Sequence, residues 1–387
     1  MMEQTALDVL AAARELAPKL SARAEEAEHL KTLPPDLVED ARRAGLFRLA
    51  LPQALGGLEL PPARLVEVIE EVTRADGSAG WTILIGNGSA FAAWLEPAVA
   101  SELLAGRDLI GGGVFAPSGK LTPSGAGKFG LSGRWTFCSG SPHADLFFNG
   151  ATIFDGESPR MVPGRGPDWR LAVVPASEVR VVDNWNVSGL RGTGSHDVLI
   201  DAMVREEHTI SPFFEPARHD GPLWRLPFFT FIGTLMAGFP LGVARRALDE
   251  FTTAAPRKFR PGSTASMADE DDVQVALTRA EGRLQSSRAF VFDVLGELWE
   301  TARAGDVPNV KQRGKFLLAT QQAMRASVSA VNTAFGFAGA SAIHADHPMQ
   351  RCFRDIHAAG QHIYFSPAAS KRYAKLRFGI GQQEFWF

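Results

Sequence analysis

The sequence predicts a mostly helical protein with a central β-barrel, which lies between a helical N-terminal domain and a C-terminal four-helix bundle. Three observations lead to this fold class. Apolar residues recur at helical spacing up to about residue 108, short β-like runs then follow one another without a helix, and long helical stretches return after residue 222. Because 387 residues are too many for one compact core, we expect separate domains at residues 1–108, 109–215 and 216–387.

The N-terminal domain is expected to contain four helices. The Leu33-Pro34-Pro35 run marks a helix boundary, since proline is tolerated in the first turn of a helix, and Gly45 marks a stop. The Gly56-Gly57 pair indicates a turn. The helices are predicted at residues 6–27, 37–44, 62–75 and 78–95.

The middle of the chain is predicted to be a series of short strands. Turn residues divide it and no helical periodicity interrupts it, which is typical of a small barrel or sandwich. The strands are predicted at residues 109–110, 128–137, 146–153, 171–174, 179–182 and 198–200.

The last domain is predicted to consist of long helices joined by short loops, which form a bundle. Residues 228–244 are nearly free of polar groups, but this stretch is about one turn shorter than the roughly 20 residues of a membrane span. It also contains three glycines and Pro240, so we expect a buried central helix. The helices are predicted at residues 228–253, 273–304, 310–337 and 351–373.

Composition excludes several classes of function. A net charge of −3 leaves no basic footprint for nucleic acid. The N-terminus lacks a basic stretch followed by an apolar one, so neither a signal peptide nor a membrane partner is expected. The two cysteines, Cys138 and Cys352, form no Cys-x-x-Cys pair or disulfide framework, which fits a reducing cytoplasm. His357 and His362 are one residue too far apart for a helical zinc pair, and no metal is expected.

Common nucleotide-binding and hydrolase motifs are missing from the sequence. No G-x-G-x-x-G sequence and no P-loop is present, so the chain shows neither a nicotinamide-dinucleotide site nor a Walker site. No Gly-x-Ser-x-Gly elbow continues into a helix. The Gly111-Gly112-Gly113 run is interpreted as a bend at a barrel corner.

Residues 133–145 carry side chains suited to flavin chemistry. This predicted strand runs into a loop and combines the rings of Trp135 and Phe137 with hydroxyl groups and loop N–H groups. An isoalloxazine ring needs apolar packing together with hydrogen bonds along its N5–C4a edge. The alternative is a barrel strand whose aromatic residues lie in the core.

A second segment, residues 336–362, carries two histidines with few competing charges. His357 or His362 could present an imidazole to a closed pocket, or one or both could be structural. The apolar helix near residue 81 offers two further candidates. Trp81 is either a pocket residue or a core aromatic, and Asn87 is either a polar contact of the pocket or a helix-packing amide.

Together these segments resemble the acyl-CoA dehydrogenase superfamily over nearly the whole chain. The order of helical domain, barrel and bundle is the same, and Phe137-Cys138-Ser139 is similar to the family's strand end against the flavin. Residues 185–195 are similar to a later loop of the same domain. In the last domain, Gly339-Ala340, Pro348 and Arg354-Asp355 match the family's glycine pair, proline and Arg-Asp pair.

The departures from the family narrow the function that the resemblance implies. An acyl-CoA dehydrogenase needs a carboxylate to remove the α-proton of its thioester, but no Asp or Glu lies between Asp355 and Glu384 or within residues 224–248. The family's residues that bind the tail of FAD are matched only in part at residues 256–262. Such losses are similar to those of the two-component flavin-dependent monooxygenases, a branch of the superfamily that the chain also resembles in residues 76–81.

The resemblance to this branch implies both an activity and a site. Reduced FMN or FAD diffuses from a separate flavin reductase, O2 adds to it to give a C4a-hydroperoxide, and an aromatic or heteroaromatic small molecule is hydroxylated. Ser139 is expected to donate to flavin N5 or to the peroxide, and His362 to hold the distal oxygen or deprotonate the substrate. The family's assembly implies a homotetramer. The expected catalytic residues are Ser139, His362 and Asn87, the cofactor contacts are Trp135, Phe137, Cys138, Ser139, Gly339 and Arg354, and the substrate contacts are Trp81, Phe231 and His357.

Other functions remain open beside aromatic hydroxylation. N-oxidation of an amine belongs to the same branch, and an acyl-CoA dehydrogenase-like oxidoreductase requires a base that the sequence does not show. A scaffold without flavin would fill the pocket with side chains. A flavin hydroperoxide decays to H2O2 when water reaches it, so the pocket should be apolar. Aromatic residues are frequent beside the proposed site, at Phe91, Trp94, Phe228, Phe229 and Phe231.

Overall fold

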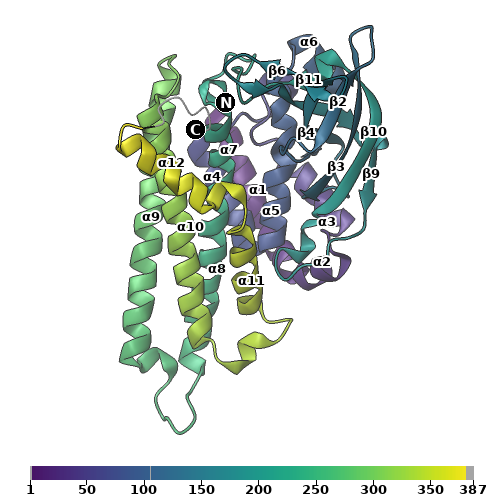
Figure 1. Cartoon of the computed structure of the whole chain (residues 1–387). Coiled ribbons are helices and arrows are strands. Elements are labelled where there is room, and N and C mark those ends of the chain that lie inside the picture. The colour runs from purple at the N-terminus through teal and green to yellow at the C-terminus, as the bar shows by residue number, and fades with distance from the viewer. Residues whose placement is uncertain (1, 105, 381–387) are drawn as a thin grey trace.

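Figure 1 shows a helical region, a curved sheet and a group of long helices, in that order along the chain. The structure is a computed structural model and describes residues 2–104 and 106–380. The predicted 6–27 helix is divided near Arg23, and the predicted 78–95 helix becomes a 3₁₀ segment at Asn87–Trp94. The first region contains α1 (Met2–Ala22), α2 (Ala24–Leu30), α3 (Pro35–Arg43), α4 (Pro62–Ala75), α5 (Gly77–Gly86) and α6 (Pro97–Leu104).

The middle region is a nine-stranded sheet that does not close into a barrel. Its strands follow the order β11-β8-β4-β2-β3-β10-β9, with β1 and β5 paired to β4, while β6 and β7 form a separate ribbon. Among the described residues the edge strands β9 and β11 do not pair, and β11 has only two residues, too few for the ladder that closure requires. The predicted barrel is therefore wrong, because the pattern along each strand does not reveal whether two distant edges meet. The strands are β1 (Gly111–Gly112), β2 (Gly119–Pro123), β3 (Lys128–Cys138), β4 (Leu146–Asp155), β5 (Ser158–Pro159), β6 (Met161–Val162), β7 (Gly166–Pro167), β8 (Trp169–Pro175), β9 (Val179–Val182), β10 (His196–Arg205) and β11 (Thr209–Ile210).

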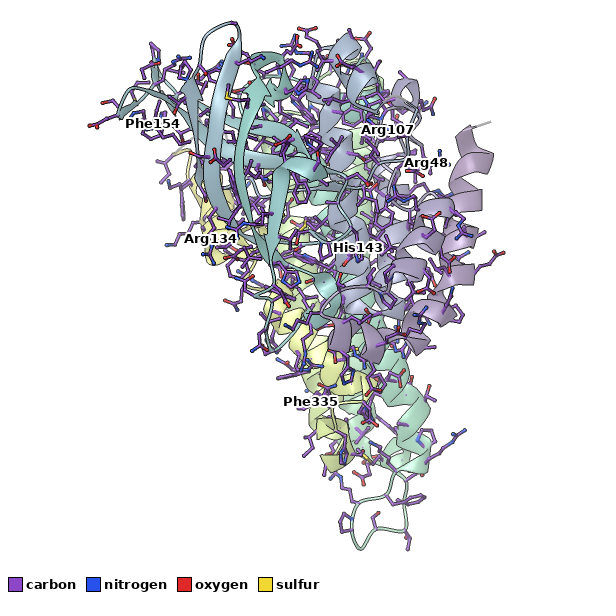
Figure 2. The ribbon with its side chains drawn as sticks, turned by 90° about the vertical axis from the view of Figure 1, so that its right-hand side faces the viewer. Arg48, Arg107, Arg134, His143, Phe154 and Phe335 are labelled. Atoms are coloured by element: carbon purple, nitrogen blue, oxygen red, sulfur yellow. The ribbon has the colours of Figure 1, made fainter. Side chains whose placement is uncertain are left out.

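The sheet contributes to two hydrophobic cores. Along β4, Leu146 and Phe148 pack into the core shared with the helices, whereas Phe147 belongs to a second core formed by the sheet and its loops. Neighbouring side chains of a strand point to opposite faces, so burial on both faces explains the nearly continuous apolar run of β4. His143, in the loop after β3, lies where the sheet meets the first helices, and its Nε2 is 2.8 Å from the hydroxyl oxygen of Thr32 (Figure 2).

In the last region, α8, α9, α10 and α11 pack against one another as a bundle (Figure 1). The predicted 228–253 helix is divided into α7 and α8, because Pro240 has no N–H to donate to the carbonyl of Met236. The predicted 351–373 helix also ends early, at Ala359. The helices are α7 (Phe228–Met236), α8 (Gly238–Ala254), α9 (Asp271–Arg303), α10 (Val310–Phe337), α11 (Pro348–Ala359) and α12 (Pro367–Arg377).

The apolar stretch that begins at Phe228 lies inside the fold. By length and composition, Phe228–Arg257 is the single part of the described chain that could cross a membrane, yet 89% of its most apolar window is buried. Its glycines allow α8 to approach α4 closely. A Cβ at Gly238 would lie 2.5 Å from the carbonyl oxygen of Val66, so a larger residue there would push the two helices apart.

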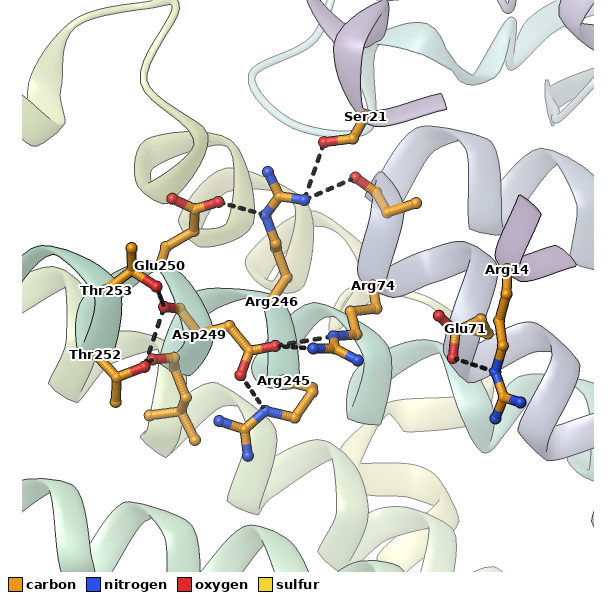
Figure 3. A network of polar contacts seen from close by, with 12 residues as sticks. Arg14, Ser21, Glu71, Arg74, Arg245, Arg246, Asp249, Glu250, Thr252 and Thr253 are labelled. Carbon is orange, nitrogen blue, oxygen red and sulfur yellow. Dashed lines mark hydrogen bonds and ion pairs between the residues drawn. The ribbon is translucent and has the colours of Figure 1, made fainter. Parts of the chain in front are cut away.

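Polar contacts also join the first region to α8 (Figure 3). Arg74 of α4 contacts Asp249 of α8 with nitrogen–oxygen distances of 2.6 and 2.8 Å, and Asp249 also accepts a hydrogen bond from Arg245 at 2.9 Å. Arg246 donates to the hydroxyl of Ser21 at 2.9 Å. Solvent-accessible pairs of this kind contribute about 0–1 kcal/mol each, so apolar packing contributes most of the stability of this junction.

Candidate active site

A chain of hydrogen-bonded hydroxyl groups begins at the end of β3. The indole Nε1 of Trp81, on α5, donates to Oγ of Ser139 at 3.0 Å. Oγ of Ser139 lies 2.7 Å from Oγ of Ser195, which in turn lies 2.6 Å from Oγ1 of Thr193. Thr193 donates to the carbonyl oxygen of Leu190 at 2.8 Å. The three hydroxyl residues, which we name the hydroxyl chain, are buried, so little water competes for their hydrogen bonds.

An irregular strand end creates this arrangement. β3 pairs with β10 in an antiparallel register that shifts between His196 and Val198, and such a bulge re-aims the neighbouring side chains. Phe137 has a φ of 62°, a conformation that is rare for a residue with a side chain, and its ring is 69% exposed. The N–H of Gly140 donates to the carbonyl of Thr193 at 2.8 Å, which fixes the turn. Strained backbone of this kind is concentrated at functional sites.

The start of α5 orients Trp81. Asp76 is the N-cap of this helix, and its carboxylate accepts a hydrogen bond from the N–H of Ala79 at 2.9 Å. A Cβ at Gly77 would lie 2.6 Å from a carboxylate oxygen of Asp355, so the glycine allows α11 to approach. These contacts fix the start of α5 and with it the direction of the Trp81 indole N–H.

The loop of residues 188–195 is fastened to two helices. The N–H of Gly192 donates to the hydroxyl of Ser78 on α5 at 3.1 Å, and the N–H of Leu190 donates to a carboxylate oxygen of Asp355 on α11 at 2.6 Å. Burial, together with a neighbouring carboxylate, raises the pKa of Asp355 to about 7. Thr193 and Ser195 of the hydroxyl chain thus lie on a loop whose backbone is held by two helices.

His362 also contacts Trp81. The centroid of the Trp81 ring is 5.5 Å from that of His362 and 5.0 Å from that of Phe239, and both contacts are edge-on. Nδ1 of His362 accepts the N–H of Tyr364 at 3.2 Å and caps a short 3₁₀ turn. Burial lowers the pKa of His362 to about 4, so the imidazole is neutral at pH 7. Because Nδ1 accepts, the single proton lies on Nε2, which makes His362 a hydrogen-bond donor at that nitrogen.

Four of the predicted site residues are therefore found at one place. Trp81 contacts both Ser139 and His362, and Phe137 lies on the same strand end. Cys138 belongs to this strand end too, but its thiol is fully buried in the core of the sheet, and burial raises its pKa to about 12. The side chain of Cys138 therefore has no surface to offer a cofactor.

Asn87 is a structural amide and not a catalytic residue. Its Oδ1 accepts hydrogen bonds from the N–H groups of Leu49 at 2.8 Å and Ala50 at 3.4 Å. Its Nδ2 donates to the carbonyl oxygens of Leu46 at 2.9 Å and Ile83 at 2.8 Å. These four bonds use the capacity of the buried amide, which therefore has nothing to offer a ligand. The alternative interpretation, a helix-packing amide, describes this residue.

Three other predicted contacts also lie apart from the cluster. Trp135 is fully buried in the core of the sheet, where its indole donates to the carbonyl of Gly150 at 2.7 Å, so it has no surface for a cofactor. Phe231 is fully buried among aromatic side chains and likewise has no surface for a substrate. Nε2 of His357 lies 2.8 Å from Oδ1 of Asn332 on α10.

Gly339 and Arg354 do not contact the hydroxyl chain. Gly339, with a φ of 71°, forms the bend after α10, and no atom lies within 4 Å of where its Cβ would be. Arg354 donates to a carboxylate oxygen of Glu28 at 2.7 Å and to the carbonyl of Ser188 at 2.5 Å. These contacts support the 188–195 loop. Direct contact of Arg354 with a cofactor stays a prediction.

The sequence did not single out Thr193, Ser195 or Trp185 as site residues. The ring of Trp185 lies 6.1 Å from that of Phe137, nearly perpendicular to it, and its indole donates to the carbonyl of Leu190 at 3.1 Å. Hydroxyl residues are common in loops, so their sequence alone indicates no site. Their hydrogen bonds to the end of β3 become visible only in the fold, which brings this loop beside β3. The similarity of residues 185–195 to a family loop was the one signal that pointed to them.

The residues of this cluster fit the ring and edge of a flavin. The exposed ring of Phe137 offers flat apolar surface, and the hydroxyl of Ser139 follows two residues later. Within the described residues, no hydrogen bond or ion pair of Trp81, Ser139 or His362 involves a carboxylate. Aromatic surface with a few convergent polar groups is what an isoalloxazine ring requires. Phe137 and Ser139 would hold the flavin.

A cavity of about 560 Å³ lies elsewhere, at the opposite ends of β3 and β10. Charged side chains line it, and several are paired with one another: Arg205 contacts Glu207 at 2.9 Å, and Arg218 contacts Glu96. A cavity with such paired charges lacks the apolar walls of an aromatic binding site, so we assign the chemistry to the strand end and not to this cavity.

Comparison with known proteins places the chain among flavin enzymes. The family models described as acyl-CoA dehydrogenase N-terminal and C-terminal domains match residues 3–99 and 234–367. The chain is 30% identical over 361 residues to indole-3-acetate monooxygenase of Pseudomonas putida, which covers 92% of this chain and 90% of that protein. The crystal structure of the HsaA monooxygenase from M. tuberculosis has a TM-score of 0.87 at 25% identity and covers 97% of this chain and 100% of that one. XiaF from Streptomyces sp., in complex with FADH2 and glycerol, has a TM-score of 0.90 at 22% identity, with coverage of 98% and 97%, and at this identity it shows the fold alone.

Proposed function

Because the chain belongs to the flavin-dependent monooxygenase branch of the acyl-CoA dehydrogenase superfamily, we propose that it hydroxylates an aromatic or heteroaromatic small molecule. It is the oxygenase component of a two-component system and takes its reduced flavin from a separate reductase. The observation that carries the proposal is the convergence of Ser139, Trp81 and His362 at the strand end that also bears the exposed ring of Phe137. The aromatic substrate named for the Pseudomonas putida relative supports the same substrate class.

Each side chain of the cluster has a separate role in this proposal. A bound reduced flavin supplies the electrons that activate O2. Trp81 holds the hydroxyl of Ser139 in one orientation beside the flavin edge. His362 provides a neutral Nε2–H donor for the oxygen that is transferred. The buried rings of Trp81 and Phe239 keep water away from the reacting atoms, which limits the loss of reducing equivalents as H2O2.

The donor set disfavours an acyl-CoA dehydrogenase reaction. That reaction needs a carboxylate base next to the flavin, and none contacts these side chains in the described part of the chain. Asp355, whose pKa is raised to about 7, reaches the cluster only through the backbone of Leu190. Asp355 is therefore a support of the loop in this proposal and not a base.

Three finer points belong to the same proposal. The flavin is FMN or FAD, and the protein acts in the cytoplasm. We also propose a homotetramer, which is supported by exposed apolar side chains on and around the last helices. These side chains are Ile343 (73% exposed), Ile363 (70%) and Phe378 (78%).

The proposal is tested by supplying the protein with a flavin reductase, NADH, O2 and either FMN or FAD, together with a panel of indoles and phenols. We expect at least one aromatic compound to gain a single oxygen atom, measured by mass spectrometry, and no product without the reductase or without O2. Two controls probe the alternatives. An amine in the panel that gains oxygen at nitrogen would replace aromatic hydroxylation by N-oxidation. Flavin reduction by an acyl-CoA thioester, with no oxygenated product, would contradict the proposal.

A further inference from the structure

The direction of every hydrogen bond in the hydroxyl chain can be deduced from its two ends. A hydroxyl group has one proton to donate and two lone pairs that accept. The carbonyl of Leu190 only accepts, so Thr193 must donate its proton there. Ser195 must then donate to Thr193, and Ser139 must donate to Ser195. At the other end the indole N–H of Trp81 only donates, so Ser139 accepts from it, which agrees with the direction counted from Leu190.

These directions leave Ser139 with one free site for a hydrogen bond. Its proton is used by Ser195, and one lone pair is used by Trp81. One lone pair remains, so Ser139 faces a ligand as a hydrogen-bond acceptor. This direction opposes the expectation from sequence that Ser139 donates to flavin N5 or to the peroxide.

We propose that Thr193 and Ser195 are positioning residues that give the site its preference for reduced over oxidised flavin, because they fix Ser139 as an acceptor. This inference rests on the proposed function, which places the flavin edge at Ser139. N5 of a reduced flavin carries a hydrogen and donates, whereas N5 of an oxidised flavin has only a lone pair. An acceptor at Ser139 matches the first and opposes the second. The oxygenase thereby favours the form of the cofactor that its reductase delivers.

The hydrogen bonds of the hydroxyl chain cannot easily reverse their direction. The chain ends on an indole N–H and a backbone carbonyl, two groups whose roles cannot be exchanged. The backbone of Leu190 is held at its N–H by Asp355 at 2.6 Å, and its carbonyl also accepts from Trp185 at 3.1 Å. The exposed fractions of Ser139, Ser195 and Thr193 are 8%, 4% and 0%, so little water is available to accept a displaced proton.

The test is a comparison of flavin affinities in the two redox states. The parent protein and the variants Thr193→Val and Ser195→Ala are titrated with FMN and with FAD, oxidised in air and dithionite-reduced under argon. In Thr193→Val, Ser195 becomes free to donate to Ser139, and in Ser195→Ala the acceptor of the Ser139 proton is gone. Both changes release the Ser139 proton for N5 of an oxidised flavin. We expect the ratio of the oxidised to the reduced dissociation constant to fall about tenfold in each variant. The midpoint potential of the bound flavin should fall by roughly 30 mV, the equivalent of tenfold for two electrons.

The control is Ser141→Ala, which alters a buried serine in the loop that follows β3. Ser141 donates to the carbonyl of Gly194 at 2.9 Å and takes no part in the hydroxyl chain, so this variant should keep the ratio of the parent. An unchanged ratio of dissociation constants in both Thr193→Val and Ser195→Ala overturns the inference. An equal fall of this ratio in Ser141→Ala does so too. A parent protein that binds neither form of either flavin contradicts the proposed function itself. Tight binding of reduced flavin with an unchanged ratio in the chain variants contradicts only the role of the hydroxyl chain.

Discussion

The Ser139→Ala variant should form about tenfold to a hundredfold less hydroxylated product per reduced flavin consumed. The change removes the acceptor at the flavin edge, so the N5–H of a bound reduced flavin would lose its partner. The indole N–H of Trp81 loses its acceptor too, which lowers stability. An unsatisfied buried hydrogen-bonding group costs about 1–3 kcal/mol, and 1.4 kcal/mol corresponds to tenfold. Reduced flavin that is held less well reacts with O2 in solution, so H2O2 should rise as product falls. Product by chromatography and H2O2 by a peroxidase assay are measured in the same reaction.

A loss of stability must be separated from this effect. Ser141→Ala is a matched comparison, because Ser141 is also buried, lies two residues away and loses one hydrogen bond on substitution. Both variants should melt at slightly lower temperatures than the parent, but only Ser139→Ala should release more H2O2 per product. Equal yields in the two variants would remove Ser139 from the site.

The His362→Ala variant should continue to consume O2 while hydroxylation falls about a hundredfold, because a donor aimed at developing charge is lost. His362→Gln, which keeps an N–H donor, should recover part of the yield. His357→Ala is the comparison for the neighbouring segment, since His357 pairs with Asn332 and not with the cluster, and its yield should match the parent. A structural histidine would give the reverse result for His362→Ala, with a lower melting temperature and an unchanged ratio of product to H2O2.

The low pKa of His362 adds a pH signature to this expectation. Burial lowers this pKa from 6.5 to about 4, so the neutral donor is the form present throughout the range from about pH 5 to 8. The ratio of product to H2O2 should therefore show no His362 titration in that range. The stabilisation that comes from keeping His362 neutral is complete above pH 6.5 and is lost as the pH falls toward 4. A titration of the ratio near pH 6.5 that disappears in His362→Gln would contradict this assignment.

The sequence predicts those features that depend on neighbours along the chain. The order of helical region, sheet and helical bundle follows from local periodicity, and the structure has the same order. The strand end at Phe137-Cys138-Ser139 combines an aromatic ring and a hydroxyl within three positions, so the segment can be singled out without a fold. The split at Pro240 has a local cause too, because proline has no N–H to donate.

Features that depend on distant contacts could not be predicted in this way. Whether the sheet closes depends on its two edge strands, which are far apart in sequence. Trp135 and Phe137 have the same parity and should share a face of β3, but β3 carries one extra residue between Trp135 and Cys138, and this bulge leaves Trp135 buried and Phe137 exposed. The amide of Asn87 is occupied by four backbone groups, which a sequence pattern does not reveal.

The central claim, that this chain transfers an oxygen atom from O2 to an aromatic compound by means of reduced flavin, is tested most directly by isotope labelling. The protein is mixed under argon with chemically reduced FMN or FAD and an aromatic substrate found in the panel, and the mixture is then exposed to a single turnover of ¹⁸O2. We predict that the hydroxylated product carries one ¹⁸O atom, with no reductase present during the turnover. A product that carries oxygen from water, or complete conversion of the reduced flavin to H2O2 without product, would contradict the account.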